Sequence, residues 1–249
     1  MKIFTCFIVS LSLAATLTLA YGIGQEEQTS AKNKNHAAIK LGAQMYDNWL
    51  KFADYQPVGN NPLYPPAGKE SGESTWRCTE CHGWDYIGKN GRYRSGDHYT
   101  GIEGIFAASQ KDMSALKNIL SDKASQHDFT PYLDAEQLDA LILFIKNGMF
   151  DSASVIDANG RAKGNDKEGA ALFAKKCVSC HKKDGNGYDF EYKQEGIQGI
   201  GWLANKDPQK VLHKIRWGNP GTYMPSLISD AKLEDNAAVD ILTYAQTLK

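Results

Sequence analysis

Two copies of one short sequence hold the residues best suited to chemistry. Cys78-Thr79-Glu80-Cys81-His82 is the first motif, and Cys177-Val178-Ser179-Cys180-His181 is the second. Cys-x-x-Cys-His is the attachment signature of c-type haem. Two thiols at this spacing, on about one helical turn, reach both vinyl groups of one porphyrin, and the adjacent imidazole lies under the iron as an axial ligand. We therefore expect two covalently bound haem c groups, attached through Cys78, Cys81, Cys177 and Cys180, with His82 and His181 on the irons.

Other uses of paired cysteines explain less of the pattern. A structural zinc site can use two Cys-x-x-Cys pairs, but it needs no His directly after each pair. Disulfides suit an exported protein, yet they leave both histidines without a role. A thioredoxin-like redox pair is usually single and belongs to an α/β pattern, which this sequence lacks. Haem attachment accounts for all four cysteines and both histidines.

The fifth cysteine, Cys6, lies in a segment typical of secretion. Lys2 is followed by residues 3–20 without a charge, and small residues stand near the end of this run. This pattern predicts a signal peptide over residues 1–20 that is removed on export. A retained membrane anchor is the alternative, because the run is at the lower edge of spanning length. We expect a periplasmic protein with no membrane span after cleavage.

Length and composition exclude several classes of protein. The chain has 249 residues, a formal charge of -1 and 42% hydrophobic residues. Such a composition is ordinary for a globular protein of one or two domains. A nucleic-acid binder would usually be markedly basic, so we expect no nucleic-acid partner.

Helices in the second half must position the second motif. An apolar stripe predicts a helix that Asn165 or Asp166 caps and that leads into the motif. A helix around residues 208–217 follows, then a Pro- and Gly-rich loop over residues 219–225. The final helix carries four apolar residues on one face: Ala238, Ile241, Leu242 and Ala245.

This order of parts resembles the class I cytochrome c domain over about 85 residues. That family is all-α, with N- and C-terminal helices that cross beside the haem. Its distal ligand is a Met, often in Met-Pro, in the loop before the last helix. The resemblance implies Met224 as the distal ligand of the second haem, with a core methionine as the alternative. A thioether is a soft ligand that suits haem iron. The resemblance also implies a contact of Gly169 and Phe173 with Tyr244.

The first half repeats this pattern with changes. Residues 37–52 are expected to form a helix, with Gly42 and Tyr46 at the places of Gly169 and Phe173. A last helix starts at Asp134 and carries Phe144 at the place of Tyr244. An insertion at about residues 50–75 separates the first helix from the motif. We therefore predict an all-α fold with two domains in tandem, over residues 21–150 and 168–249, joined by a linker at residues 151–167.

The repeat also predicts the distal ligand of the first haem. If Ile119 corresponds to Ile215, His127 falls eight residues later and Met224 nine residues later in their respective halves. His127 is therefore the favoured ligand. Met113, His98 and an open or water-bound iron are the alternatives.

The two halves depart from the family after each motif. Class I domains usually have a Pro there, whose carbonyl accepts the proton of the proximal imidazole. Neither half has one, so another carbonyl must serve. Arg92, Arg94 and Arg216 are candidates for pairing with haem propionates, with surface solvation as the alternative.

The resemblance implies a soluble dihaem cytochrome that carries single electrons between periplasmic redox partners and docks with them transiently. A bis-His first haem should have the lower potential and a His/Met second haem the higher. One alternative is a dihaem electron-transfer subunit of a larger respiratory complex. Another is a haem-dependent oxidoreductase that oxidises sulfur compounds, as thiosulfate dehydrogenases do. We favour the carrier over the enzyme.

Overall fold

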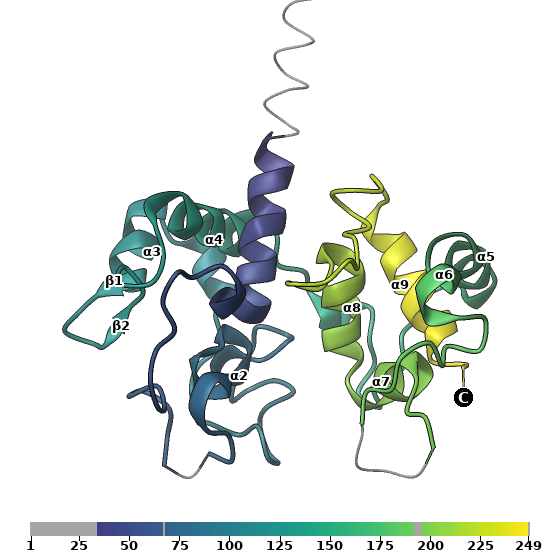
Figure 1. The fold of residues 1–249 in the computed structure, drawn as a ribbon, viewed down its shortest axis with the longest axis horizontal. Helices are drawn as coiled ribbons and strands as arrows, with labels where there is room; N and C mark the ends of the chain where they lie inside the picture. The colour runs from purple at the N-terminus through teal and green to yellow at the C-terminus, as the bar shows by residue number, and fades with distance from the viewer. Residues whose placement is uncertain (1–33, 67, 192–195, 249) are drawn as a thin grey trace, which may run out of the picture. The chain divides into compact units, whose positions relative to one another are not determined.

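The structure, a computed structural model, describes residues 34–66, 68–191 and 196–248. The predicted signal peptide over residues 1–20, with Cys6, lies outside the described residues. The described chain is mostly helical, as the sequence predicts, with a small sheet in which β1 (Ser121–Asp122) pairs antiparallel with β2 (His127–Asp128) (Figure 1). Ala38–Lys249 form one compact unit. Within the described ranges, no helix is long and apolar enough to cross a membrane.

The N-terminal part of this unit places the first motif on a short helix. A helix over residues 34–48 comes first. It is followed by η1 (Trp49–Lys51), η2 (Gly72–Trp76), α2 (Cys78–His82), η3 (Phe106–Gln110), α3 (Met113–Leu120) and α4 (Ala135–Asn147). The start of α4 is fixed by a capping box. The Asp134 carboxylate accepts from the Gln137 backbone N–H, and the Gln137 side chain accepts from that of Asp134.

The C-terminal part places the second motif at the end of a longer helix. Its elements are η4 (Ser152–Ser154), α5 (Asp166–Lys176), α6 (Val178–His181), α7 (Ile200–Lys206), α8 (Pro208–Trp217) and α9 (Asp235–Ala245). The Asn165 side chain caps α5 by accepting from two backbone N–H groups. Pro208 occupies the first position of α8. A backbone N–H at this position would have no partner within the helix, so the N–H that proline lacks costs no hydrogen bond.

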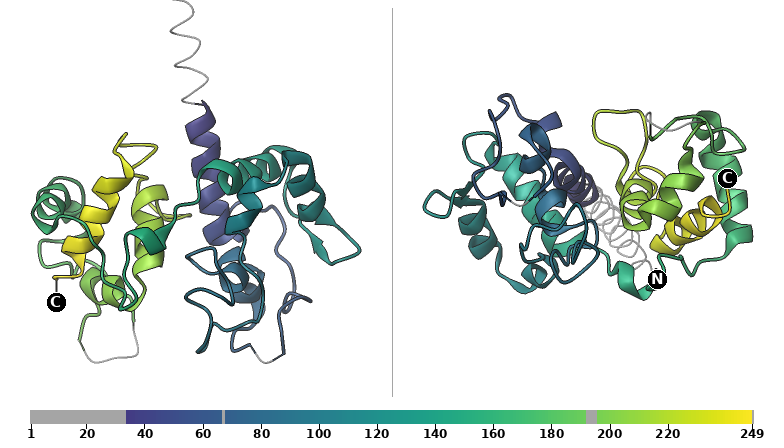
Figure 2. Two further views of the ribbon diagram at one scale, coloured as in Figure 1. Left: turned by 180° about the vertical axis from the view of Figure 1, so that it is seen from behind. Right: turned by 90° about the horizontal axis from the view of Figure 1, so that it is seen from below.

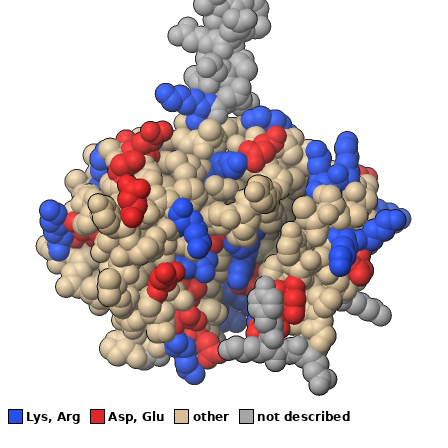
Figure 3. Space-filling view, viewed as in Figure 1, with Lys and Arg blue, Asp and Glu red and all other residues tan. Residues whose placement is uncertain are grey.

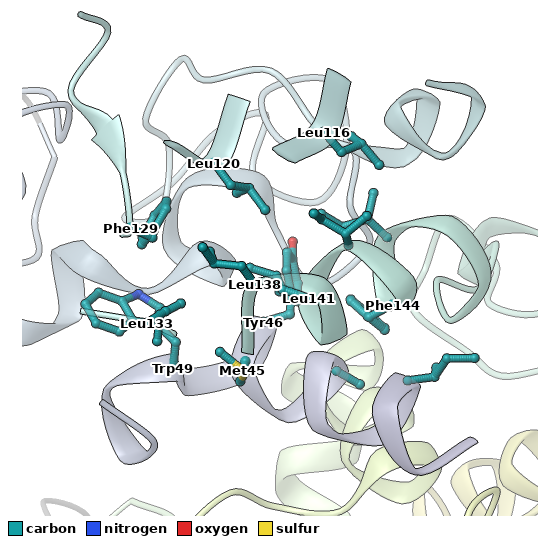
Figure 4. Packing of buried hydrophobic residues seen from close by; sticks show 14 of the residues in the cluster. Met45, Tyr46, Trp49, Leu116, Leu120, Phe129, Leu133, Leu138, Leu141 and Phe144 are labelled. Carbon is teal, nitrogen blue, oxygen red and sulfur yellow. The ribbon is translucent and has the colours of Figure 1, made fainter. Parts of the chain in front are cut away.

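Apolar side chains gather in two cores. The first core joins the helix over residues 34–48 with α3 and α4, and Trp49, Tyr46 and Phe144 are its largest fully buried side chains (Figure 4). The second core joins α5, α7, α8 and α9. Trp217, at the end of α8, belongs to the first core. The last turn of α8 therefore contributes apolar surface to the N-terminal part of the chain.

Each core contains a close helix crossing built around a glycine. Helix α5 packs against α9 (Figure 2). A Cβ on Gly169 of α5 would lie 1.9 Å from the Asp240 carbonyl oxygen of α9. A Cβ on Gly42 would lie 2.0 Å from the Ala140 carbonyl oxygen of α4. Only glycine permits backbones this close. The aromatic neighbours match as well, since the sequence predicts a contact of Phe173 with Tyr244, and their ring centres lie 5.4 Å apart.

Residues 151–167, which composition marks as a linker, pack closely on the second core. Ile156 is 4% exposed and belongs to that core. The Gln246 side chain accepts from the Ala162 backbone N–H and donates to the Gly160 carbonyl. The Gly and polar residues of this segment predict a loop. Its backbone groups bond to the Gln246 side chain where they would otherwise bond to water, and these bonds hold the loop against the second core.

A buried histidine joins the N-terminal part to α8. His213 is 2% exposed. Its Nδ1 lies 3.0 Å from the Tyr86 hydroxyl, and its Nε2 lies 3.0 Å from the Ala43 carbonyl oxygen. Burial lowers the pKa of His213 to about 3. The ring is therefore neutral at pH 7, with Nε2–H donating to Ala43 and Nδ1 accepting from Tyr86.

Candidate functional site

The first Cys-x-x-Cys-His motif forms the whole of α2, a short helix of 5 residues. Cys78 and Cys81 are both partly buried. Gly83 ends the helix with a φ of 77°, a conformation that favours glycine. The Tyr46 hydroxyl donates to the Gly83 carbonyl at 2.6 Å, so the first core holds the end of the motif in place.

His82 is oriented as a metal ligand. Its Nδ1 lies 2.7 Å from the Glu103 carbonyl oxygen. Burial lowers the pKa of His82 to about 4, so the ring is neutral at pH 7. With Nδ1–H donating to Glu103, the lone pair is left on Nε2, as ligation requires. The Glu103 carbonyl therefore accepts from the imidazole that the sequence analysis expects to be held by a carbonyl other than that of a proline.

His127 faces His82 from the short hairpin that follows α3. The two ring centres lie 6.4 Å apart, with the planes at 77°. The Nδ1 of His127 lies 3.0 Å from the Ile119 carbonyl oxygen, which leaves its Nε2 free to bind. Two imidazoles that bind one metal ion from opposite sides, with bonds of about 2.0–2.1 Å, have ring centres roughly 6 Å apart. The pair therefore fits a haem iron between the two rings.

The other candidates for this position lie elsewhere. Met113 begins α3 and is 46% exposed. The Nδ1 of His98 lies 3.1 Å from a Glu80 carboxylate oxygen, and its ring stacks on Tyr93. Neither the exposed position of Met113 nor the contacts of His98 direct these side chains toward His82. The geometry therefore favours His127, whose role as distal ligand stays a prediction.

The second motif borders a cavity of about 630 Å³. Cys177 ends α5, Cys180 and His181 lie on α6, and Met224 lies in the loop before α9. All four side chains line this cavity. Its volume falls in the range of small-molecule and cofactor pockets, about 300–1,000 Å³. The fold thus brings together both thiols, an imidazole and a thioether that lie up to 47 residues apart in sequence.

The walls of this cavity suit a flat apolar group. They include six buried or partly buried apolar side chains: Phe173, Ile200, Leu203, Val211, Leu227 and Ile241. Burial lowers the pKa of His181, which keeps its ring in the neutral, ligating form. Its Nδ1 is buried without a partner among the described residues. The proximal carbonyl found for His82 therefore has no counterpart in the described part of the second half.

Cys78, Cys81 and Cys177 are poorly suited to thiol chemistry of their own. None of the four described cysteines forms a disulfide. Burial raises the pKa of Cys78 to about 12 and that of Cys177 to about 11. A redox-active or zinc-bound cysteine needs the thiolate, which these environments disfavour. A thioether bond to a haem vinyl group leaves sulfur uncharged and is compatible with burial.

The sequence does not predict three charged residues that line the cavity. Asp47, Arg77 and Lys214 line its rim. Of the arginines considered from sequence, Arg216 is instead buried and paired with Asp235, and Arg92 donates to the Lys206 carbonyl. The one feature of the sequence that could have pointed to Arg77 is its place directly before Cys78.

A protein-family model described as "Cytochrome C oxidase, cbb3-type, subunit III" matches residues 164–244. None of the curated proteins matches the chain. The family match covers the second motif, Met224 and the C-terminal part of the cavity lining. This part of the chain is therefore a cytochrome c domain, a type of domain that binds haem c covalently and transfers electrons.

Proposed function

Starting from the cytochrome c domain in residues 164–244, we propose that the chain is a periplasmic dihaem cytochrome that carries single electrons between redox partners. The two domains lie in tandem, and each holds one haem c. The observation that carries the proposal is the cavity that collects Cys177, Cys180, His181 and Met224. The matching glycine crossings at Gly42 and Gly169 support a second domain of the same kind.

Each site has a defined set of protein groups. Cys78 and Cys81 would attach the first haem, and His82 and His127 would bind its iron. Cys177 and Cys180 would attach the second haem, and His181 and Met224 would bind its iron. When bound, each haem supplies one-electron redox chemistry. The Glu103 and Ile119 carbonyls fix the orientation of the first pair of imidazoles, and apolar side chains line the second site.

The number and place of the haems can be tested by mass. The secreted protein should carry two covalent haems. A variant with Cys78→Ala and Cys81→Ala should keep only the second haem, and one with Cys177→Ala and Cys180→Ala only the first. A wild-type mass with fewer than two haems would refute the dihaem proposal. N-terminal sequencing of the periplasmic fraction tests cleavage near residue 20.

The ligand sets predict two different reduction potentials. Met ligation raises the potential of a haem relative to bis-His ligation. The first haem should therefore have the lower potential and the second the higher, so electrons would tend to move toward the C-terminal domain. A redox titration followed by low-temperature electron paramagnetic resonance reports both ligand sets and both potentials. Two equal potentials would contradict this assignment.

A second candidate is an electron-transfer subunit of a larger respiratory complex. The description of the matching family, an oxidase subunit, favours it. Affinity purification from the native membrane and periplasm distinguishes the two, because a subunit co-purifies in fixed proportion while a carrier does not. Catalytic oxidation of thiosulfate with a small artificial electron acceptor, and without any partner protein, would instead identify an enzyme.

A further inference from the structure

Charged side chains from both parts of the chain meet at the rim of the second cavity. Asp47 is 1% exposed, although it is an acid. One of its carboxylate oxygens accepts from Arg77 at 2.8 Å, and the other accepts from Lys214. Lys214 also donates to the Asn219 side chain at 2.6 Å. We refer to Asp47, Arg77 and Lys214 as the rim cluster.

The rim cluster is held rigidly. The Arg77 Nε donates to the Asp47 carbonyl at 2.9 Å, so both the main chain and the side chain of Asp47 bind this arginine. The Trp84 ring centre lies 5.4 Å from the Lys214 Nζ and 5.9 Å from the Arg77 Cζ. These contacts restrict both cations to the cavity side of the helix over residues 34–48, as cation–π and ion-pair contacts commonly do.

Positive charge is in excess around this cavity. Its charged lining consists of Lys51, Arg77, Lys176, Lys210 and Lys214 against Asp47 and Asp189. Lys and Arg side chains line the hollow between the helix over residues 34–48 and α8 (Figure 3). Burial lowers the pKa of Lys214, which shows that its charge is poorly solvated. Arg77, Lys210 and Lys214 are partly buried, and an excess of partly buried cations favours an anionic partner in the same space.

The chemistry of that partner follows from the walls and the rim together. The walls accept a flat apolar body, and the rim accepts negative charge. A porphyrin attached through its vinyl groups carries two carboxylates on its opposite edge. Arg binds a carboxylate through parallel hydrogen bonds, and Lys binds it as a point charge. The cysteines come from α5 and α6, whereas the rim cluster comes from α8, the helix over residues 34–48 and the start of α2.

Resting on the function proposed above, we propose that Arg77 and Lys214 bind the propionates of the second haem, while Asp47 positions both cations. Two members of the rim cluster belong to the N-terminal part, so residues outside the C-terminal domain set the potential of its haem. Arg77 directly precedes Cys78. One residue therefore contacts the second haem and adjoins the attachment site of the first.

The rim cluster predicts opposite effects for opposite charges. A reduced haem has one more electron than an oxidised one, so a nearby cation favours reduction and a nearby anion opposes it. Lys214→Gln should lower the potential of the second haem, shifting the ratio of oxidised to reduced haem about tenfold, or about 59 mV for one electron. Asp47→Asn should raise it. A purely structural cluster would give no such reversal of sign.

The experiment is a redox titration of the holoprotein, with each haem followed by its own spectroscopic signal. Lys214→Arg should restore most of the lost potential, and Arg77→Gln should lower it as Lys214→Gln does. Lys167→Gln, an exposed lysine on α5 outside the cavity lining, is the matched control and should leave both potentials unchanged. Mass spectrometry verifies the haem content of every variant.

The outcomes separate the two proposals. If haem is bound to Cys177 and Cys180 but Lys214→Gln and Asp47→Asn shift its potential no more than the control, the assignment of the rim cluster is wrong and the proposed function stands. If wild-type protein carries no haem there, both are wrong. Equal shifts of both haems would show a general electrostatic effect and would also overturn the specific assignment.

Discussion

Met224 packs against the second core and lines the cavity beside the second motif. It is partly buried beside the second core, and the residue before it in the loop, Tyr223, is fully exposed. A methionine with a purely apolar role would be expected deeper in the core, as Met45 is at 0% exposure. A position at the cavity wall instead leaves its thioether available to iron, which thioethers bind well.

Met224→Ala should abolish the sulfur-to-iron charge-transfer band of the oxidised protein. It should also lower the potential of the second haem, because Met ligation raises it. Optical spectroscopy of the oxidised holoprotein checks the band. Met113→Ala is the matched control, since Met113 is 46% exposed at the start of α3, and it should keep the band in full. A band that survives Met224→Ala excludes this residue as the ligand.

His127→Ala should convert the first haem partly to the high-spin state. The substitution removes the only imidazole that the described structure places opposite His82. Electron paramagnetic resonance of the oxidised protein detects the change. His98→Ala is the control and should leave the first haem low-spin, because His98 is engaged with Glu80. An unchanged low-spin signal in His127→Ala would move the assignment to Met113 or His98.

Helix crossings hold the elements that carry these ligands. The close approach of α5 and α9 at Gly169 fixes the end of α5, where the second motif begins. In the N-terminal part, the crossing at Gly42 places Tyr46 so that its hydroxyl reaches the end of the first motif. Both crossings put a helix backbone against its partner with no side chain between them, so the motif position depends on them.

Gly169→Ala should destabilise the protein by about 1–3 kcal/mol, as overpacking typically does. The new Cβ would meet the Asp240 carbonyl oxygen at 1.9 Å, and this clash outweighs the helix propensity that favours Ala by about 1 kcal/mol. Chemical denaturation followed by circular dichroism measures the free energy of unfolding. Ala171→Ser, at an exposed position of α5, should change it by less than about 0.5 kcal/mol. A stabilised Gly169→Ala variant would show that the helices separate easily.

Contacts between the N-terminal part and α8 make the molecule more than two independent domains. His213 bonds to Tyr86 and Ala43, and Trp217 packs in the first core. The rim cluster adds ionic contacts across the same boundary. This boundary buries a titratable ring, so its stability should depend on pH.

His213→Gln should make the protein less sensitive to acid. Burial depresses the pKa of His213 from its usual 6.5 to about 3, so protonation favours unfolding. The contribution of the neutral ring is complete above pH 6.5 and is lost as the pH falls from 6.5 toward 3. As the pH is lowered through that window, the free energy of unfolding of the wild type should fall more steeply than that of His213→Gln. The difference between the two slopes should be roughly 1 kcal/mol per pH unit. Gln keeps one donor for Ala43 and one acceptor for Tyr86.

Denaturation of both proteins at a series of pH values measures this difference. Carboxylates titrate in both and cancel in the comparison, so only the difference in slope matters. His36→Gln, a partly exposed histidine near the start of the first described helix, is the control and should follow the wild type. Equal slopes for wild type and His213→Gln would show that the ring is solvated and protonates freely in the folded protein.

Local sequence determined much of this protein. The boundaries of α8 and the capping box of α4 follow from residues close in sequence. The contact of Phe173 with Tyr244 joins distant residues, and the resemblance to class I cytochrome c domains implied it before the structure placed the two rings 5.4 Å apart. The attachment chemistry also lies within five consecutive residues. Such features depend on spacing along a helix, which the sequence states directly.

Only the tertiary structure determined the contacts between residues that are distant in sequence. The Glu103 carbonyl beside His82, the packing of residues 151–167 and the rim cluster all join groups far apart in sequence. No local pattern marks Asp47 as buried or directs Arg77 toward the second cavity. A motif fixes which residues can hold a haem, because that chemistry is local. The surroundings of the haem depend on how α8 packs against the N-terminal part, and such packing is fixed only by the whole fold.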